Sequence, residues 1–138
     1  MEHKELRQLL DAMIRSAKLT FEKTGNLQPF AIALNDQGKI RQLVFPERPD
    51  RTTEETIRFF EAGLELIAQK TTCKAVGLCS EIQLNGFAVM RVVFILEHRD
   101  RCAYRVVVPD LFDAKHWDGR RMEQRFFVRG NSFSASRW

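Results

Sequence analysis

The sequence contains no apolar run long enough to cross a membrane. Its longest apolar stretches have the length of strands, whereas a membrane-spanning helix needs about 20 apolar residues. The first residues, Met1 to Glu5, lack the basic start, apolar centre and small-residue cleavage site of a signal peptide. We therefore expect a cytoplasmic protein with no membrane partner.

Metal-binding and nucleotide-binding signatures are also missing. The three histidines lie in separate segments, and the seven glycines are too scattered for a phosphate-binding loop. Cys73, Cys79 and Cys102 form no C-x-x-C pair and lie in or beside apolar runs, which is typical of reduced, buried thiols. The sequence predicts no metal, no cofactor and no catalytic residues, and it favours a protein that is not an enzyme.

Internal repeats and low-complexity tracts are absent from the 138 residues. Hydrophobic residues make up 44% of the chain and charged residues 29%, which is the composition of a globular protein. We expect one domain over residues 1–138, with a basic and aromatic C-terminal segment at 110–138. The formal charge of +4 favours an acidic partner without specifying one.

Apolar residues recur every three or four positions between residues 3 and 23, which predicts a helix with one apolar face. Gly25 follows as a left-handed C-terminal cap. Two strand-length runs, 30–34 and 39–45, flank a polar turn and predict a β-hairpin. Thr52 and Glu55 have the spacing of a capping box, which predicts a second helix over about 53–70.

The strongest β signal runs from residue 75 to residue 108. Asn85-Gly86 and a charged turn at 98–101 divide this stretch into three strands. With a C-terminal strand at 125–129, the sequence predicts an α+β fold with an antiparallel sheet of five or six strands. The predicted order is α-β-β-α-β-β-β(-β), with the two helices mainly on one face.

The turns also predict the register of the three central strands. A two-residue loop at Asn85-Gly86 pairs Ser80 with Arg91. A turn centred on residues 99 and 100 pairs Val93 with Val106. In this register Leu78, Val93, Ile95, Tyr104 and Val106 share one face, and Met90, Val92, Phe94, Leu96 and Val107 share the other.

Both faces of these strands therefore carry large apolar side chains. We do not expect two helices to cover both, and an exposed apolar patch of several hundred Å² is uncommon on a monomer. We expect the second face to be covered by the C-terminal segment or by a second copy of the chain in a homodimer.

Charged residues inside the strands are candidates for a ligand site. Arg91 and Arg105 interrupt apolar runs; an arginine that faces a groove suits an anionic ligand, although each could instead meet a carboxylate or solvent. Glu97 and His98 lie at a charged turn, where an imidazole beside a carboxylate can titrate near neutral pH or simply be solvated.

Residues 110–138 mix cations with aromatic rings, as single-strand nucleic-acid binders do. Six cations and four carboxylates leave this segment a net charge of only +2. A strand with arginines on its solvent face is therefore the simpler interpretation, and nucleic-acid binding is the third alternative for function.

Three segments, residues 28–34, 75–79 and 96–103, together resemble a group of small uncharacterised bacterial α+β proteins. The shared features are a proline-led first strand, a helix, and a three-stranded meander that turns at Glu-His-Arg-Asp. The resemblance implies the order α-β-β-α-β-β-β and implies no activity. The C-terminal segment departs from this pattern.

The sequence as a whole favours a non-enzymatic domain that binds another protein, or a second copy of itself, through a sheet face or the C-terminal segment. The candidate interaction residues are Met90, Val92, Phe94, Leu96, Trp117, Arg121, Arg125 and Phe127. The alternative is an enzyme or a binder of a small anionic ligand, with a site where Arg91, Arg105, Glu97 and His98 converge.

Overall fold

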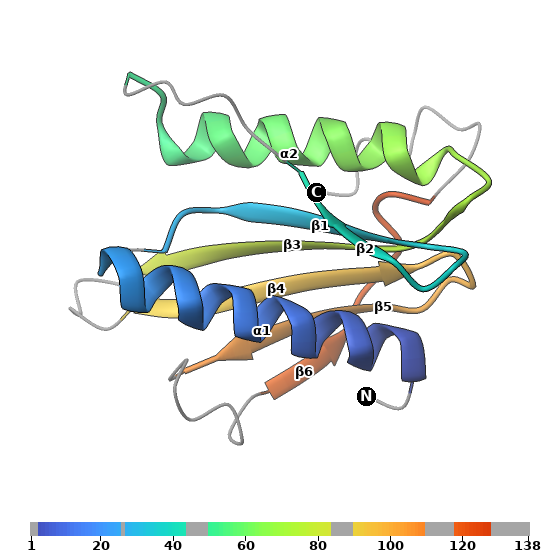
Figure 1. Cartoon of the computed structure of the whole chain (residues 1–138), viewed down its shortest axis with the longest axis horizontal. Helices are drawn as coiled ribbons and strands as arrows, with labels where there is room; N and C mark the ends of the chain where they lie inside the picture. Colours follow the sequence, from blue (N-terminus) through green and yellow to red (C-terminus); the bar gives the residue numbers. More distant parts are fainter. Residues whose placement is uncertain (1–2, 26, 44–49, 84–89, 110–117, 128–138) are drawn as a thin grey trace.

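A computed structural model of the chain describes residues 3–25, 27–43, 50–83, 90–109 and 118–127 (Figure 1). These residues form two helices and one six-stranded antiparallel sheet, which confirms the predicted α+β class and the order of elements. The helices and strands are α1 (Lys4–Thr24), β1 (Phe30–Asn35), β2 (Ile40–Gln42), α2 (Thr53–Ala68), β3 (Cys73–Gln83), β4 (Met90–His98), β5 (Ala103–Val108) and β6 (Asp118–Arg121). No helix in the described ranges is long and apolar enough to cross a membrane.

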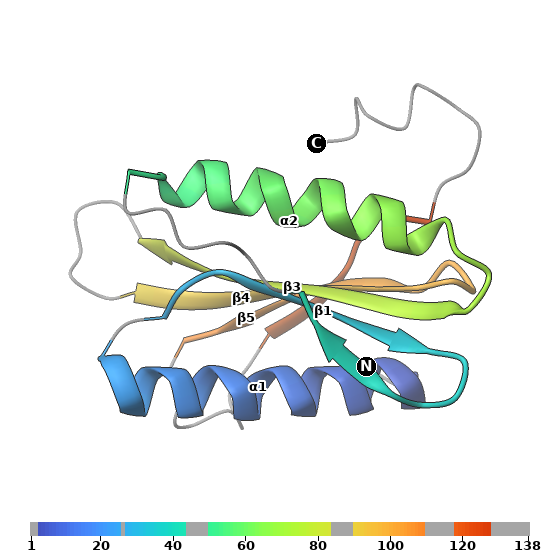
Figure 2. The same ribbon diagram turned by 45° about the horizontal axis from the view of Figure 1, so that its top comes forward.

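One helix lies on each face of the sheet, whose strand order is β2-β1-β3-β4-β5-β6 (Figure 2). α1 packs on β3 and β4, and α2 packs on β1 and β3. The prediction that both helices lie mainly on one face is therefore wrong. The reason is that β3 is apolar on both sides: Ala75 and Cys79 face α1, whereas Val76 and Leu78 face α2.

α1 begins and ends with local caps. The Nδ1 atom of His3 accepts a long hydrogen bond of 3.4 Å from the Leu6 N–H. At the other end, Gly25 has a φ of 72° and donates its N–H to the Phe21 carbonyl. A left-handed residue at this position favours glycine, which has no Cβ to clash. The predicted C-terminal cap is confirmed.

Side chains also hold both ends of α2. The predicted capping box forms at its start, where Thr52 Oγ1 accepts the Glu55 N–H at 3.1 Å and donates to the Glu55 carboxylate. At its end, the guanidinium group of Arg99 donates to backbone carbonyls of the last helical residue and of the loop that follows it. These carbonyls belong to Ala68, Lys70 and Thr71. A cation at this end also complements the helix dipole.

β3 pairs with β4 in a register that differs by two residues from the prediction. Ser80 lies opposite Val93, not opposite Arg91, and the last described pair is Gln83 with Met90. The predicted Asn85-Gly86 loop lies at 84–89, outside the described residues. Because a shift of two residues keeps each side chain on its own face, the predicted faces of β3 and β4 are unchanged.

The turn between β4 and β5 contains one residue more than predicted. The His98 N–H donates to the Cys102 carbonyl at 2.7 Å, which leaves residues 99–101 in the turn. Arg101 takes a φ of 76°, as the last residue of a three-residue hairpin loop commonly does. Val106 consequently lies opposite Phe94. The predicted faces of β5 are wrong: Tyr104 and Val106 face α1.

The sixth strand is not where the sequence predicts it. β6 lies at Asp118–Arg121 and pairs with β5, whereas residues 125–127 are not in a strand. The N–H groups of these three residues are all directed to the carboxylate of Glu97. Because one side chain takes them, they are not available to pair with a neighbouring strand. Residues 128 and 129 of the predicted strand lie outside the described residues.

Candidate functional site

The four predicted ligand residues do not meet in one place. Glu97 and His98 are neighbours in β4, so their side chains lie on opposite faces of the sheet. His98 faces Glu5 of α1. Arg105 is exposed and lies opposite Ile95 in β4, and Arg91 lies toward the other end of that strand. The structure therefore separates the imidazole from the two arginines by the thickness of the sheet.

Glu97 has a structural role in the described part of the chain. Its side chain is buried, with 1% of the residue exposed. Its carboxylate accepts the backbone N–H groups of Arg125, Phe126 and Phe127, the last at 2.9 Å. The Arg125 guanidinium also pairs with Glu61 of α2. Glu97 thus fixes residues 125–127 against the sheet beside α2, where Phe126 is buried.

Three of the eight predicted interaction residues are not on the surface. Val92, Phe94 and Leu96 are buried beneath α1, so the sheet face expected to be open is covered by a helix. Phe127 is partly buried in the cluster beneath α2. Arg121 is exposed in β6. Trp117 and the side chain of Met90 lie outside the described residues.

A hollow of about 400 Å³ lies between the β1–β2 hairpin and the end of α2, and we call it the β2–α2 hollow. It is lined by residues 33–37, Lys39, Arg41 and Leu43 of the hairpin, by Ile67 and Lys70 at the end of α2, and by Thr72 and Cys73. Its volume lies within the usual range of about 300–1,000 Å³ for ligand sites. The sequence analysis did not predict this site.

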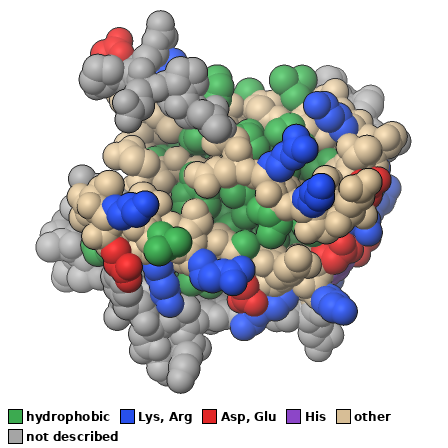
Figure 3. All heavy atoms as spheres, in the orientation of Figure 1, with side chains coloured by type: hydrophobic (Ala, Val, Ile, Leu, Met, Phe, Trp, Pro, Cys, Tyr) green, Lys and Arg blue, Asp and Glu red, His purple; other side chains and the backbone are tan. Residues whose placement is uncertain are grey.

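The β2–α2 hollow combines an apolar floor with a cationic rim. Ala33, Leu43 and Ile67 are half-buried, whereas Lys39, Arg41 and Lys70 are exposed; Asp36 is its one acidic lining residue. Figure 3 shows one face of the molecule, on which apolar side chains gather in the middle and charged side chains, most of them Lys and Arg, lie around them. Within the described ranges, no carboxylate forms an ion pair with any of these three cations. The hollow is therefore electrostatically suited to an anion.

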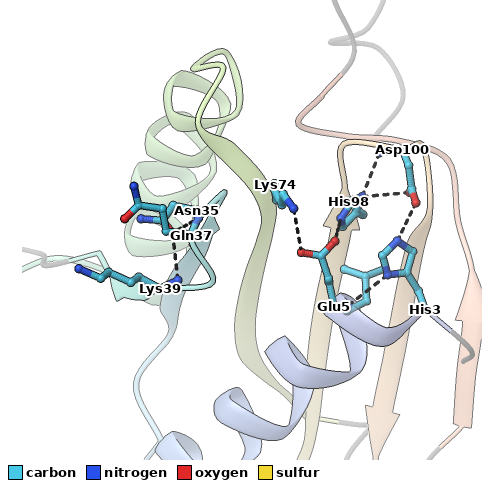
Figure 4. Close-up of polar contacts among 9 residues, drawn as sticks. His3, Glu5, Asn35, Gln37, Lys39, Lys74, His98 and Asp100 are labelled. Atoms are coloured by element: carbon cyan, nitrogen blue, oxygen red, sulfur yellow. Dashed lines mark hydrogen bonds and ion pairs between the residues drawn. The ribbon is translucent and has the colours of Figure 1, made fainter.

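The hairpin wall of the hollow is held rigid by hydrogen bonds. Asn35 Oδ1 accepts the N–H groups of Gln37 and Lys39, each at 2.9 Å (Figure 4). The Asp36 N–H donates to the Thr72 carbonyl at 2.8 Å, which joins the hairpin to the loop after α2. The hollow is thus formed before any ligand binds, which lowers the entropic cost of binding.

The second polar constellation lies at the start of α1. His3 Nε2 is 2.6 Å from Asp100 Oδ2, and His98 Nδ1 is 3.1 Å from Asp100 Oδ1. His98 Nε2 is 3.1 Å from Glu5 Oε1, and Lys74 Nζ is 3.6 Å from Glu5 Oε2 (Figure 4). We call His3, His98 and Asp100 the histidine–aspartate cluster. The sequence analysis singled out His98 beside a carboxylate, but it did not predict the contact with His3.

The carboxylates of this region favour their charged forms. Partial burial acts to raise the pKa of Asp100, but hydrogen bonds from His3 and the Cys102 N–H outweigh it and hold that pKa below its ordinary value. The pKa of Glu5 is also lowered, because His98 and Lys74 outweigh the opposing effect of burial. Both side chains therefore carry negative charge at neutral pH.

The cysteines are not candidates for nucleophilic chemistry. All three are free thiols; Cys73 and Cys79 are buried, and Cys102 is half-buried. Burial raises the pKa of the Cys79 thiol well above its ordinary value, and the Glu81 carboxylate raises it further. Burial also raises the pKa values of Cys73 and Cys102. Because the thiolate is the reactive form, these residues serve packing, as the sequence predicts.

Comparisons of the chain with protein-family models, with curated proteins and with solved structures found no match.

Proposed function

We propose that this protein is a non-enzymatic binding protein that holds an acidic, extended segment of a partner protein in the β2–α2 hollow. The observation that carries the proposal is the placement of Lys39, Arg41 and Lys70 around an apolar floor beside an edge strand. The edge strand suits an extended chain, the apolar floor suits apolar side chains, and the cations suit acidic side chains.

The edge strand supplies hydrogen-bonding groups for an extended chain. β2 lies at the edge of the sheet. The Asn35 N–H donates to the Lys39 carbonyl, and the Leu43 N–H donates to the Ala31 carbonyl. The odd-numbered residues in and beside β2 therefore direct their backbone N–H and C=O groups toward β1. In an antiparallel ladder the alternate residues, Ile40 and Gln42, then direct their backbone groups to the open edge. A peptide that adds as a further strand would pair with them.

The hollow supplies the side-chain specificity. Side chains of an added strand alternate between the two faces of the sheet. Those on the α2 side would meet the apolar floor formed by Ala33, Leu43 and Ile67, and the adjacent rim of cations. The expected partner segment therefore alternates apolar and acidic residues. A short edge strand with exposed cations is also a common protection against unwanted strand pairing. A direct measurement of binding distinguishes this role from peptide binding.

Selection from a displayed library of random peptides provides this test, because it works without an identified partner. We expect enriched peptides to be rich in Asp and Glu alternating with apolar residues. Arg41→Glu should weaken their binding at least about tenfold, since it replaces attraction with repulsion at an exposed position. Arg15→Glu makes the same charge change on an exposed position of α1 and should leave binding unchanged.

Three outcomes would overturn the proposal. One is the absence of any enriched peptide, and another is enrichment of peptides that bind Arg41→Glu as well as the unaltered chain. The third is tighter binding of a fluorescent single-stranded oligonucleotide at low salt than of any selected peptide, which would instead favour the nucleic-acid alternative.

Homodimerisation stays a separate prediction. Val92, Phe94 and Leu96, which were expected at its interface, lie beneath α1, so the dimer would need a different surface. Light scattering on the purified chain measures its mass directly.

A further inference from the structure

We propose that His3, His98 and Asp100 bind a divalent transition-metal ion of the zinc type. This inference is independent of the β2–α2 hollow. It starts from the convergence of two distant parts of the chain. His3 and Asp100 are 97 positions apart, yet one ligand atom from each of His3, His98 and Asp100 lies within 4.8 Å of the others.

The spacing suits a small ion with short bonds. Zinc binds histidine nitrogen and carboxylate oxygen at about 2.0–2.2 Å, so its ligand atoms lie somewhat more than 3 Å apart in a tetrahedral site. The two shortest separations in the cluster, 2.6 Å and 3.1 Å, are hydrogen-bond distances, so an ion would move His3 Nε2 and Asp100 Oδ2 apart to more than about 3 Å. Two imidazoles and one carboxylate form a donor set that prefers zinc and its neighbours to calcium or magnesium, which prefer oxygen ligands.

The hydrogen bonds of His98 place the lone pair of its ring on Nδ1, on the side of Asp100. Its Nε2 faces the Glu5 carboxylate, so this nitrogen carries a proton. In the neutral ring Nδ1 is then a lone-pair donor, and it faces the charged Asp100 Oδ1. That lone pair accepts the Asp100 N–H at 3.0 Å, so a metal ion bound at Nδ1 would replace this hydrogen bond. Glu5 would orient the metal-bound imidazole, as carboxylates do in many zinc sites.

His3 completes the site at a small cost. Its Nε2 lies against Asp100 Oδ2, and its Nδ1 accepts the Leu6 N–H at 3.4 Å. Binding metal through Nε2 would move the ring proton to Nδ1 and replace the hydrogen bond to Asp100. It would also break the contact with the Leu6 N–H, which is already longer than a normal hydrogen bond. The rings of His3 and His98 have centroids 4.1 Å apart, so both can reach one ion.

The degree of exposure favours a site that an ion can enter. The His98 side chain is 9% exposed and that of His3 is 16% exposed, whereas that of Asp100 is 48% exposed. Buried imidazoles hold the ion, and the open side beside Asp100 admits it and leaves one position for water. Three protein ligands with a water in the fourth position are common in zinc proteins.

The test is a titration of the full chain, without a histidine tag and after treatment with a chelator, with Co²⁺ and then with Zn²⁺. We expect one equivalent of Co²⁺ to bind with the strong visible absorption of a four-coordinate site, and one equivalent of Zn²⁺ to displace it. His3→Asn and Asp100→Asn should each weaken binding at least about tenfold.

The variants are chosen to keep the fold. Asparagine is a good helix N-cap, so His3→Asn removes a metal ligand and preserves the cap of α1; circular dichroism checks this. Asp11→Asn changes an exposed carboxylate elsewhere on α1, and His116→Gln changes the remaining histidine of the sequence. Both should bind as the unaltered chain does.

Failure of the unaltered chain to take up one equivalent of Co²⁺ or Zn²⁺ at micromolar concentration would overturn the proposal. Equal binding by His3→Asn and Asp100→Asn would also overturn it, because the metal would then lie elsewhere. Neither result would affect the peptide proposal, which uses other residues.

Discussion

α1 buries six side chains against the sheet, whereas α2 buries only three, although both helices are amphipathic. The face beneath α1 contains large apolar side chains such as Phe94 and Leu96, which belong to one cluster with Met13 of α1. The face beneath α2 contains smaller residues, among them Ala31 and Ala33, and also includes the buried carboxylate of Glu97 and the β2–α2 hollow.

This difference indicates that the two faces of the sheet have different roles. A closely packed apolar face contributes most of the stability, because buried area and dense packing both favour folding. A face that is covered incompletely leaves room for a hollow and for polar contacts that a partner could use. The proposed peptide site therefore lies on the α2 side of the sheet. The histidine–aspartate cluster lies at the rim of the α1 side, where the helix begins.

The largest expected effect is the loss of Phe94 from the α1 face. Phe94 is fully buried, and truncation of such a residue to alanine typically costs about 3–5 kcal/mol. Urea unfolding of Phe94→Ala measures this loss. Phe60→Ala, on the α2 face, should cost less, because the cluster that contains Phe60 includes several small side chains. Equal losses would show that the two faces are packed alike.

A smaller loss is expected when Glu97 becomes glutamine. The buried carboxylate accepts three backbone N–H groups, and an amide would turn a donor toward one of them. Hydrogen bonds to charged groups contribute about 1.5–3 kcal/mol, and we expect Glu97→Gln to reduce the free energy of unfolding by roughly that amount. Faster hydrogen exchange at residues 125–127 should accompany it.

Glu123→Gln is the matched control for this loss, because Glu123 is exposed in the same segment. It should change the free energy of unfolding by less than about 0.5 kcal/mol. If Glu97→Gln changes the free energy of unfolding by as little as Glu123→Gln does, the attachment of residues 125–127 does not depend on the charge of the carboxylate.

The features that the sequence predicts correctly are local ones. The apolar stripe of α1, the glycine cap at Gly25 and the capping box at Thr52 each depend on residues within a few positions of one another. The α+β class follows from these elements and from the alternation in β3 to β5. Such patterns act through local backbone conformation, and they do not depend on the rest of the chain.

The features that the sequence did not predict depend on particular side-chain contacts, and two of these features depend on contacts that are distant in the sequence. The extra residue in the turn after His98 is stabilised by Asp100, whose N–H donates to His98 Nδ1 and whose carboxylate accepts the Cys102 N–H. The strand expected at residue 125 is absent because Glu97, 28 positions earlier, takes its N–H. The β2–α2 hollow exists only once α2 has packed on the sheet, so its cations could not be grouped from the sequence.

The smallest expected effect comes from a pair of matched substitutions, Ala75→Val and Ala33→Val. Ala75 is fully buried on the α1 face, and added methyl groups in a close-packed core typically cost about 1–3 kcal/mol. Ala33 lines the hollow and is half-buried. Its valine should fit into open space, and the free energy of unfolding should change by less than about 0.5 kcal/mol, since valine also favours strands.

The same pair connects the packing of the two faces with the proposed function. Ala33→Val should lower the affinity for the selected acidic peptides about tenfold, because the added methyl groups fill the floor of the hollow. Ala75→Val should bind these peptides with unchanged affinity at temperatures where it remains folded. Thermal unfolding and fluorescence anisotropy on both variants provide the two measurements. If Ala33→Val destabilises the protein as much as Ala75→Val does, there is no open space at Ala33. The α2 face is then packed as tightly as the α1 face, and the hollow cannot serve as a binding site.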